Sequence, residues 1–131
     1  MFLLDTNICI YVMKHRPPQL LEKFEAVAAE TMGISVITLA ELEHGVAKSQ
    51  AVMKNRQVLE AFLSHVEIMD WNQGAARVYG EISTALERRG MVIGQMDLMI
   101  AAHALSLDSI LITNNVREFE RIPGLILENW V

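Results

Sequence analysis

The sequence predicts an α/β fold in which helices cover both faces of a parallel sheet. Short apolar runs alternate with longer segments of helical period, and the runs do not alternate with polar residues, so each is typical of a strand buried on both faces. Strands separated by helices need crossover connections, which make neighbouring strands parallel. The chain has 131 residues, 52% of them hydrophobic, without a repeat or a linker, so we expect one domain over residues 1–131.

The first strand is predicted over residues 2–5, where three large apolar residues lead directly into Asp5. A helix over 7–14 follows. The Pro-Pro pair after this helix ends it, because proline lacks the amide hydrogen that a helix interior needs. The second of these prolines can open the next helix, which we expect over 19–30.

The rest of the chain continues the alternation. Thr38 can cap the helix after the second strand, because Glu41 lies three residues later in the spacing of a capping box. Gly90 stands in the usual position after a helix C-terminus. Strands are predicted over 33–36, 66–69, 110–112 and, at the sheet edge, 125–127. Helices are predicted over 38–49, 51–64, 72–89 and 96–105.

Three carboxylates stand at the borders of apolar segments. Asp5 ends the first strand, Glu41 follows the second strand, and Asp97 lies in the first turn of an apolar helix. In parallel sheets, binding sites form outside the carboxyl ends of the strands. Asp97 has apolar neighbours three and four residues on, so an ionised side chain there needs a partner from elsewhere in the fold.

The sequence leaves plainer explanations open for each acid. Asp5 and Asp97 can cap the helices near which they lie, and Glu41 can complete a capping box or lie at the surface. A group of short polar residues after the strand 110–112 includes Thr113, and Glu118 follows within one turn, where a solvated charge is equally typical.

Carboxylates gathered from separate strand ends would raise one another's pKa values unless a cation lay among them. Oxygen ligands without a His or Cys pattern suit Mg²⁺ or Mn²⁺. Such a site can activate water and stabilise the charge that develops in phosphodiester cleavage. The spacing of the acids therefore makes an acidic metal site plausible without requiring one.

The overall charge limits the range of nucleic-acid functions. Eleven Lys and Arg residues oppose sixteen Asp and Glu residues, a net charge of −5, which argues against a strong nonspecific nucleic-acid binder but allows a local basic patch. Three short basic clusters are candidates for RNA contacts, with a solvated surface as the alternative: Lys14 with Arg16, Arg88 with Arg89, and Arg117 with Arg121.

The single cysteine, Cys9, lies in an apolar run and is expected to be a small buried hydrophobic residue. The lone cysteine and the lack of a signal peptide predict a reducing cytoplasm. The longest uncharged apolar stretches are shorter than the ~20 residues that cross a bilayer, so no membrane insertion is expected.

Four segments together resemble the PIN-domain ribonucleases and, within them, the VapC toxins of bacterial type II toxin–antitoxin pairs. They are LLDTN near the start, ISVITLAELEHGVAKS, IGQMDLMIAAHA and LITNNVREFERIPGLILENW. They occur in the family's order and cover nearly the whole chain. The resemblance implies a three-layer α/β/α sandwich with a mainly parallel central sheet.

The resemblance also implies roles for individual residues. Asp5, Glu41 and Asp97 match the family's catalytic acids and metal ligands. Thr6 and Asn7 match the signature of the first strand.

The segment after the fourth strand departs from the family pattern. Thr113 matches a small polar residue that supports the site, but Asn115 stands where many members carry an aspartate. Either Asn115 or Glu118 could take the fourth acidic position, or the site has only three acids. This departure leaves open whether one or two metal ions bind.

The activity implied by the resemblance is a Mg²⁺-dependent endoribonuclease, with Mn²⁺ able to substitute. Its substrate would be structured RNA such as tRNA, and its cleavage would inhibit translation until an antitoxin neutralises it. The implied partners are a VapB-like antitoxin and a second copy in a homodimer, with DNA reached only through the antitoxin. The apolar residues of the predicted helix 51–64, among them Val52, Leu59 and Phe62, are candidates for the antitoxin surface.

Three rivals remain at this point. A phosphotransfer module also uses strand-end acids and Mg²⁺, but Asp5-Thr6-Asn7 lacks the Asp-x-Asp run that one such class needs, and no lysine follows the strand 110–112 as the other needs. A nuclease of the same fold that cuts DNA flaps or ribosomal RNA precursors is the second. A non-catalytic interaction protein is the third, although such a protein has no need to keep buried charges.

Overall fold

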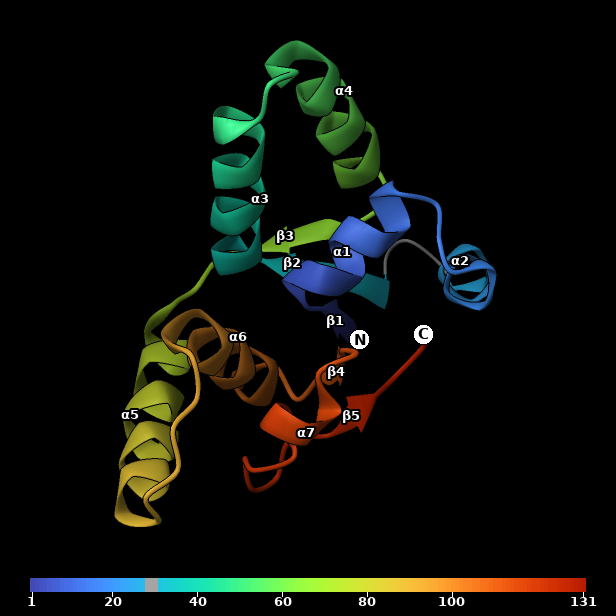
Figure 1. The fold of residues 1–131 in the computed structure, drawn as a ribbon. Helices are drawn as coiled ribbons and strands as arrows, with labels where there is room; N and C mark the ends of the chain where they lie inside the picture. Colours follow the sequence, from blue (N-terminus) through green and yellow to red (C-terminus); the bar gives the residue numbers. More distant parts are fainter. Residues whose placement is uncertain (28–30) are drawn as a thin grey trace.

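The computed structural model describes residues 1–27 and 31–131, which form a five-stranded, wholly parallel sheet (Figure 1). The strand order is β3-β2-β1-β4-β5, so the chain first builds outward from β1 to β3 and then returns to the other side of β1. The strands are β1 (Phe2–Leu4), β2 (Met32–Ser35), β3 (Glu67–Met69), β4 (Ile110–Ile112) and β5 (Leu127–Glu128).

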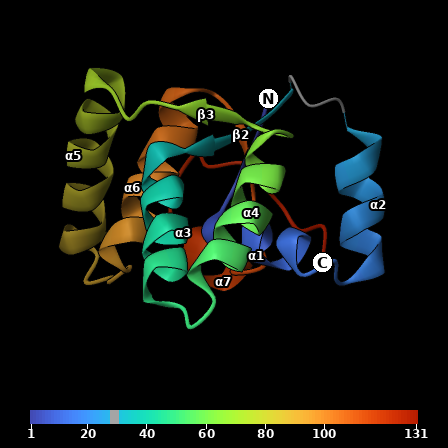
Figure 2. The same cartoon turned by 90° about the horizontal axis from the view of Figure 1, so that it is seen from above.

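Helices lie on both faces of the sheet, which confirms the predicted three-layer α/β/α sandwich (Figures 1 and 2). In the part of the chain that the structure describes, the first four helices pack on one face and the last three on the other. In chain order they are α1 (Thr6–Met13), α2 (Pro18–Ala26), α3 (Val36–Lys48), α4 (Val52–Leu63), α5 (Gln73–Arg88), α6 (Gln95–Ser106) and α7 (Val116–Phe119).

The central strands bury both of their faces. Leu3 and Leu111 belong to the core between the sheet and α5 and α6, whereas Leu4 and Ile112 belong to the core under α1, α3 and α4. All four side chains are fully buried. Neighbouring residues of a strand point to opposite faces, so an uninterrupted apolar run is what a doubly covered strand requires.

The predicted elements are found with their ends shifted by a residue or a few. Gly90 follows the C-terminus of α5 with φ of +66°, a left-handed conformation that glycine adopts without strain. Cys9 is completely buried, as predicted. Helix α2 ends at Ala26, and the predicted extension of this helix to residues 28–30 lies outside the described residues.

The predicted cap of α3 is wrong. The helix begins two residues before Thr38, and Ser35 is its N-cap, with its side-chain oxygen accepting a hydrogen bond from the Ile37 amide at 3.1 Å. Thr38 is fully buried inside the helix instead. Ser35, the last residue of β2, therefore caps the helix that follows without a loop between them, and Glu41 lies in the second turn, free of a capping role.

The strand order changes direction between β1 and β4, because β2 and β3 lie on one side of β1 and β4 and β5 lie on the other. In open parallel sheets, the carboxyl ends of two such strands form a crevice at this switch point. Asp5 follows β1 and Thr113 follows β4, so both lie at the mouth of the crevice. Among the described residues, no helix is long and apolar enough to cross a membrane.

Candidate active site

Asp5 both caps α1 and faces the crevice. Its Oδ1 accepts a hydrogen bond from the Ile8 amide at 2.9 Å, and its Oδ2 accepts one from the Thr113 hydroxyl at 2.5 Å. The residue is only 4% exposed. Burial raises the pKa of Asp5, although these two donors favour the ionised form. A carboxylate can accept about four hydrogen bonds, so Asp5 keeps free lone pairs.

Thr113 ties the two central strands together at the crevice. Its oxygen accepts a hydrogen bond from the Asn115 amide at 2.9 Å, while its hydroxyl proton is donated to Asp5. Thr113 is fully buried, so each of these polar groups would cost free energy without its partner. The strand end is therefore built to hold a carboxylate in one orientation.

Glu41 is oriented by the first turn of α1. The Thr6 hydroxyl donates a hydrogen bond to Glu41 Oε1 at 2.6 Å, and the buried Thr38 hydroxyl lies 3.2 Å from the same Thr6 oxygen. Glu41 and Lys14 also line one hollow of about 360 Å³ between α1, α3 and α4. Asn7, the second residue of α1, is exposed to solvent.

Asp97 is partly buried in the first turn of α6, where three other acids act on it. Its pKa is raised to about 6, first by burial and then by the charges of Glu118, Glu41 and Asp5. A hydrogen bond with Glu118 acts in the same direction. The four carboxylates come from the end of β1, from α3, α6 and α7, so the fold brings together acids that are up to 113 positions apart in the chain.

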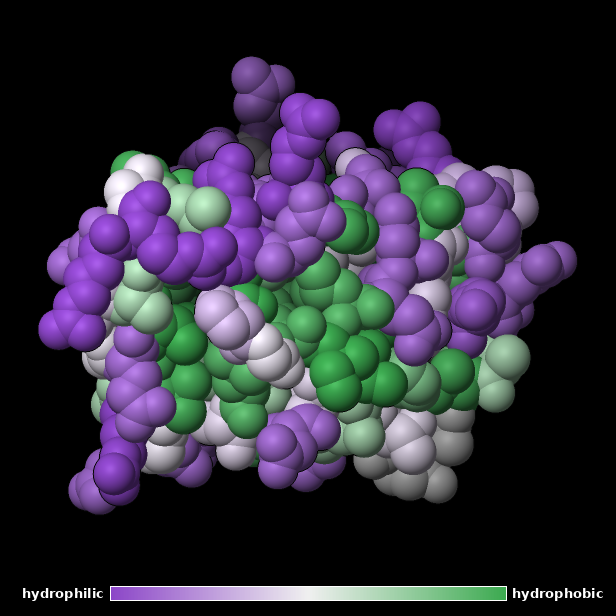
Figure 3. Space-filling model, turned by 90° about the horizontal axis from the view of Figure 1, so that it is seen from below, coloured by the Kyte–Doolittle hydropathy of each residue, from purple (hydrophilic) through white to green (hydrophobic). Residues whose placement is uncertain are grey.

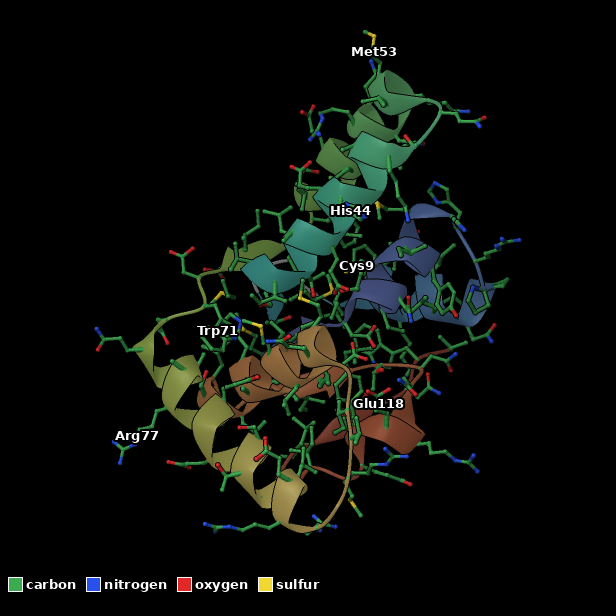
Figure 4. All side chains as sticks on the ribbon, turned by 60° about the vertical axis from the view of Figure 1, so that its left-hand side comes forward. Cys9, His44, Met53, Trp71, Arg77 and Glu118 are labelled. Atoms are coloured by element: carbon green, nitrogen blue, oxygen red, sulfur yellow. The ribbon has the colours of Figure 1, made fainter. Side chains whose placement is uncertain are left out.

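Glu118 extends from α7 toward the loop that precedes α6 (Figure 4). Its Oε1 accepts a hydrogen bond from the Gly94 amide at 3.1 Å, and its Oε2 accepts one from the Asn115 side-chain amide at 2.7 Å. Gly94 was not predicted as a site residue, because its only signal in the sequence is its position just before a helix. Its amide is one of the helix-terminal donors that lack a partner within the helix.

The four acids suit a divalent cation by the chemistry of their atoms. They offer oxygen ligands alone. Burial is the first cause of the raised pKa of Asp97, and the charges of the other three acids raise it further, so the acids repel one another. Among the described residues, no group of three or more His, Cys, Asp or Glu side chains is arranged so that it could hold a metal ion. The carboxylates that lack two fixed donors, Glu41 and Asp97, would therefore have to turn toward a bound ion.

The candidate basic residues lie on two parts of the surface. Lys14 and Arg16 are exposed just after α1, and Lys14 shares the hollow of Glu41. Arg88 and Arg89 are exposed at the end of α5.

The fold joins two basic clusters that are separate in the sequence. The Arg89 guanidinium donates to the backbone oxygen of Arg121 at 3.2 Å, and the Arg121 guanidinium donates to the backbone oxygen of Val92 at 3.0 Å. These contacts attach the loop between α5 and α6 to the end of α7. The same loop continues to Gly94, so this basic surface adjoins the acidic cluster.

Comparisons with known proteins add to this geometry. The PIN domain family matches residues 2–125 of the chain. Ribonuclease VapC2 of Rickettsia felis is 46% identical over 130 residues, which cover 98% of this chain and 97% of that protein. The tRNA(fMet)-specific endonuclease VapC of Salmonella typhimurium is 45% identical over 129 residues, with 98% and 97% covered. A crystal structure of VapBC2 from Rickettsia felis bound to a promoter DNA fragment contains a chain with a TM-score of 0.94 and 45% identity, with 99% and 98% covered.

Proposed function

This chain belongs to the PIN-domain family and, within it, to the VapC ribonucleases, and on that premise we propose that it is a Mg²⁺-dependent endoribonuclease. The observation that supports the metal dependence is the gathering of Asp5, Glu41, Asp97 and Glu118 from four separate elements at one crevice. Four acids that act on one another at a strand-end crevice are costly for a fold unless they have a task, and oxygen ligands in such a cluster suit Mg²⁺ or Mn²⁺.

Asp5, Glu41 and Asp97 would hold the ion, with Asp5 and Asp97 in direct contact and Glu41 in contact directly or through water. A bound divalent cation supplies Lewis acidity and a water of lowered pKa to phosphodiester hydrolysis. The chain's own contribution is orientation. Thr113 and the Ile8 amide hold the Asp5 carboxylate, and the Thr6 hydroxyl holds that of Glu41.

The substrate proposed is structured RNA, and tRNA in particular. Because water would be the nucleophile, the chemistry does not require the RNA 2′-hydroxyl, so the geometry of the acids alone does not select RNA over DNA. The selection rests on relatives named ribonuclease and tRNA(fMet)-specific endonuclease. Exposed Lys14, Arg16, Arg88 and Arg89 are the cations available to contact the phosphates.

The regulatory role proposed is that of the toxin in a type II toxin–antitoxin pair, neutralised by a VapB-like antitoxin. Solved relatives are VapBC complexes, and DNA would be reached through the antitoxin. The residues predicted to bind the antitoxin need a correction, although they stay on the same helix, α4. Leu59 and Phe62 belong to the core, whereas Val52, Met53 and Val58 are the exposed apolar residues of α4. Met53 points away from the body of the molecule (Figure 4).

A homodimer is the second assembly proposed. Apolar side chains gather in the middle of the face that is turned to the reader in Figure 3, with hydrophilic side chains around them. Contiguous apolar surface of this kind is typical of an interaction site. A single monomeric species in sedimentation at micromolar concentration would argue against the dimer.

The experiment that tests the activity is cleavage of total cellular RNA with Mg²⁺, with EDTA, and by the variant Asp97→Asn. We expect cleavage by the wild type with Mg²⁺ only and none by the variant. Asp108→Asn is a matched control, because Asp108 is exposed and its φ of +50° suits asparagine. Undiminished cleavage in EDTA would refute the metal dependence. Undiminished cleavage by Asp97→Asn would refute the assignment of Asp97 to the active site.

A further inference from the structure

We propose that Asn115 is a positioning residue whose side-chain amide holds Glu118 beside Asp97 and thereby sets how tightly the acidic cluster binds a divalent cation. This inference rests on the proposed metal dependence. It gives Asn115 a task other than that of a neutral ligand. It also makes Glu118 and Asn115 one functional pair.

The first support is the unusual use of an asparagine at a helix start. Asn115 is the N-cap of α7, and asparagine at an N-cap ordinarily accepts a hydrogen bond from the helix backbone. The Asn115 side chain makes no such bond. Its amide nitrogen donates instead to Glu118 Oε2 at 2.7 Å. A carboxylate can only accept, so the nitrogen and not the oxygen of the Asn115 amide must face it.

The second support is that Asn115 is itself held in place. Its backbone amide donates to Thr113 Oγ1 at 2.9 Å, and the Thr113 hydroxyl donates to Asp5 Oδ2. A continuous series of hydrogen bonds therefore runs from the Glu118 carboxylate to the Asp5 carboxylate. Asn115 is the link that ties the position of one acid to the strand end that carries the other.

The third support is that Glu118 is held close to Asp97, a side chain of like charge. A Cβ atom built on Gly94 would lie 3.8 Å from Asp97 Oδ2 and 4.0 Å from Glu118 Oε1, so the two carboxylates flank the same point of the backbone. Among the described residues, two amide donors hold Glu118 beside the like-charged Asp97: the Gly94 backbone amide and the Asn115 side chain. Without the Asn115 side chain, the partly buried Glu118 carboxylate loses one of these two amide donors and can turn away from Asp97 toward solvent.

The same contact with Glu118 explains why position 115 carries a neutral residue. An aspartate at 115 would face Glu118 with a like charge where an attractive N–H···O bond now exists. The asparagine is therefore the partner that Glu118 needs.

The test is a double-mutant cycle on metal affinity, with Mn²⁺ binding measured by calorimetry on the purified chain without RNA. The variants are Asn115→Ala, Glu118→Gln and the double variant. We expect Asn115→Ala to weaken Mn²⁺ binding by about tenfold or more, the usual cost of losing a residue that orients a ligand. We expect the double variant to bind Mn²⁺ as Glu118→Gln does, because Asn115 acts through Glu118.

A second readout separates positioning from a general structural role. Raising the Mg²⁺ concentration should restore RNA cleavage by Asn115→Ala, since the defect lies in metal affinity. A loss of cleavage that excess Mg²⁺ leaves unchanged would contradict the inference. Asn114→Ala is the matched control, because Asn114 is the exposed neighbour and its side-chain oxygen only accepts from Asn129.

The possible failures are distinguishable. Losses of Mn²⁺ affinity that add in the double variant, or an unchanged affinity of Asn115→Ala, would overturn the inference and leave the proposed function intact. A wild-type chain that binds no Mn²⁺ at millimolar concentration would overturn the metal dependence of the proposed function and, with it, the role assigned to Asn115.

Discussion

Asp97→Asn should stabilise the metal-free protein at neutral pH while it abolishes RNA cleavage. In the folded chain the pKa of Asp97 is raised from 3.8 to about 6, chiefly by burial and by Glu118. The ionised carboxylate is thus less stable in the folded chain than in the unfolded chain. An asparagine of the same shape carries no charge and removes this cost, and its amide can donate to Glu118.

The size of the expected stabilisation follows from the shift in the pKa of Asp97. About two pKa units correspond to about 3 kcal/mol at about 1.4 kcal/mol per unit. Because Asp97 is only half buried, solvent screening reduces the expected gain in the free energy of unfolding to about 1 kcal/mol. For a domain of this size, a gain of 1 kcal/mol raises the melting temperature by roughly 4 °C.

The pH dependence has a definite sign. A folded-state pKa above the unfolded value means that the folded chain binds the proton more tightly. Stability should therefore rise as the pH falls from about 7 toward 4 and should be lost again as the pH rises through about 6. Asp5, whose pKa is also raised, contributes in the same direction. Asp97→Asn should show a smaller pH dependence than the wild type.

The assay is thermal unfolding in EDTA at pH 7.5 and pH 5, with Asp108→Asn as the charge-matched control. We expect the stabilisation of Asp97→Asn to be clear at pH 7.5 and to shrink at pH 5. A variant that is no more stable than the wild type at pH 7.5 would refute the idea that burial and the neighbouring acids destabilise the ionised Asp97 side chain. An equal gain from Asp108→Asn would assign the effect to net charge instead.

Three further predictions concern the surroundings of the cluster. Thr113→Val keeps the shape of the buried side chain but removes the donor to Asp5, so denaturant unfolding should show a loss of about 1–3 kcal/mol; an unchanged midpoint would contradict the hydrogen bond's importance. Replacing Arg88 and Arg89 by glutamine should reduce the slope of log affinity for single-stranded RNA against log salt concentration by up to ~1.4. A binding titration with an unchanged slope would show that the two arginines do not contact RNA. Met53→Glu should weaken neutralisation by a co-expressed antitoxin and leave purified cleavage activity unaltered, and full neutralisation would place the antitoxin away from the end of α4.

Local patterns were sufficient to predict most of the elements. The strand at β1 follows from three consecutive apolar residues, and the end of α5 follows from Gly90, which adopts the left-handed conformation that the position favours. The start of α3 was predicted wrongly for a local reason as well. Thr38 and Glu41 have capping-box spacing, but Ser35 offers a cap two residues earlier, and burial of Thr38 against Thr6 favours that alternative.

The sequence by itself determined that acids stand at the borders of apolar strands and helices, because strand length, turn residues and apolar runs are properties of neighbouring residues. Only the tertiary structure decided which groups hold those acids. The donor to Asp5 comes from Thr113, 108 positions away, and the donors to Glu118 come from Gly94 and Asn115 on two different segments. Such pairs form when whole elements pack, and packing depends on the complementary shape of two cores rather than on any local spacing of residues.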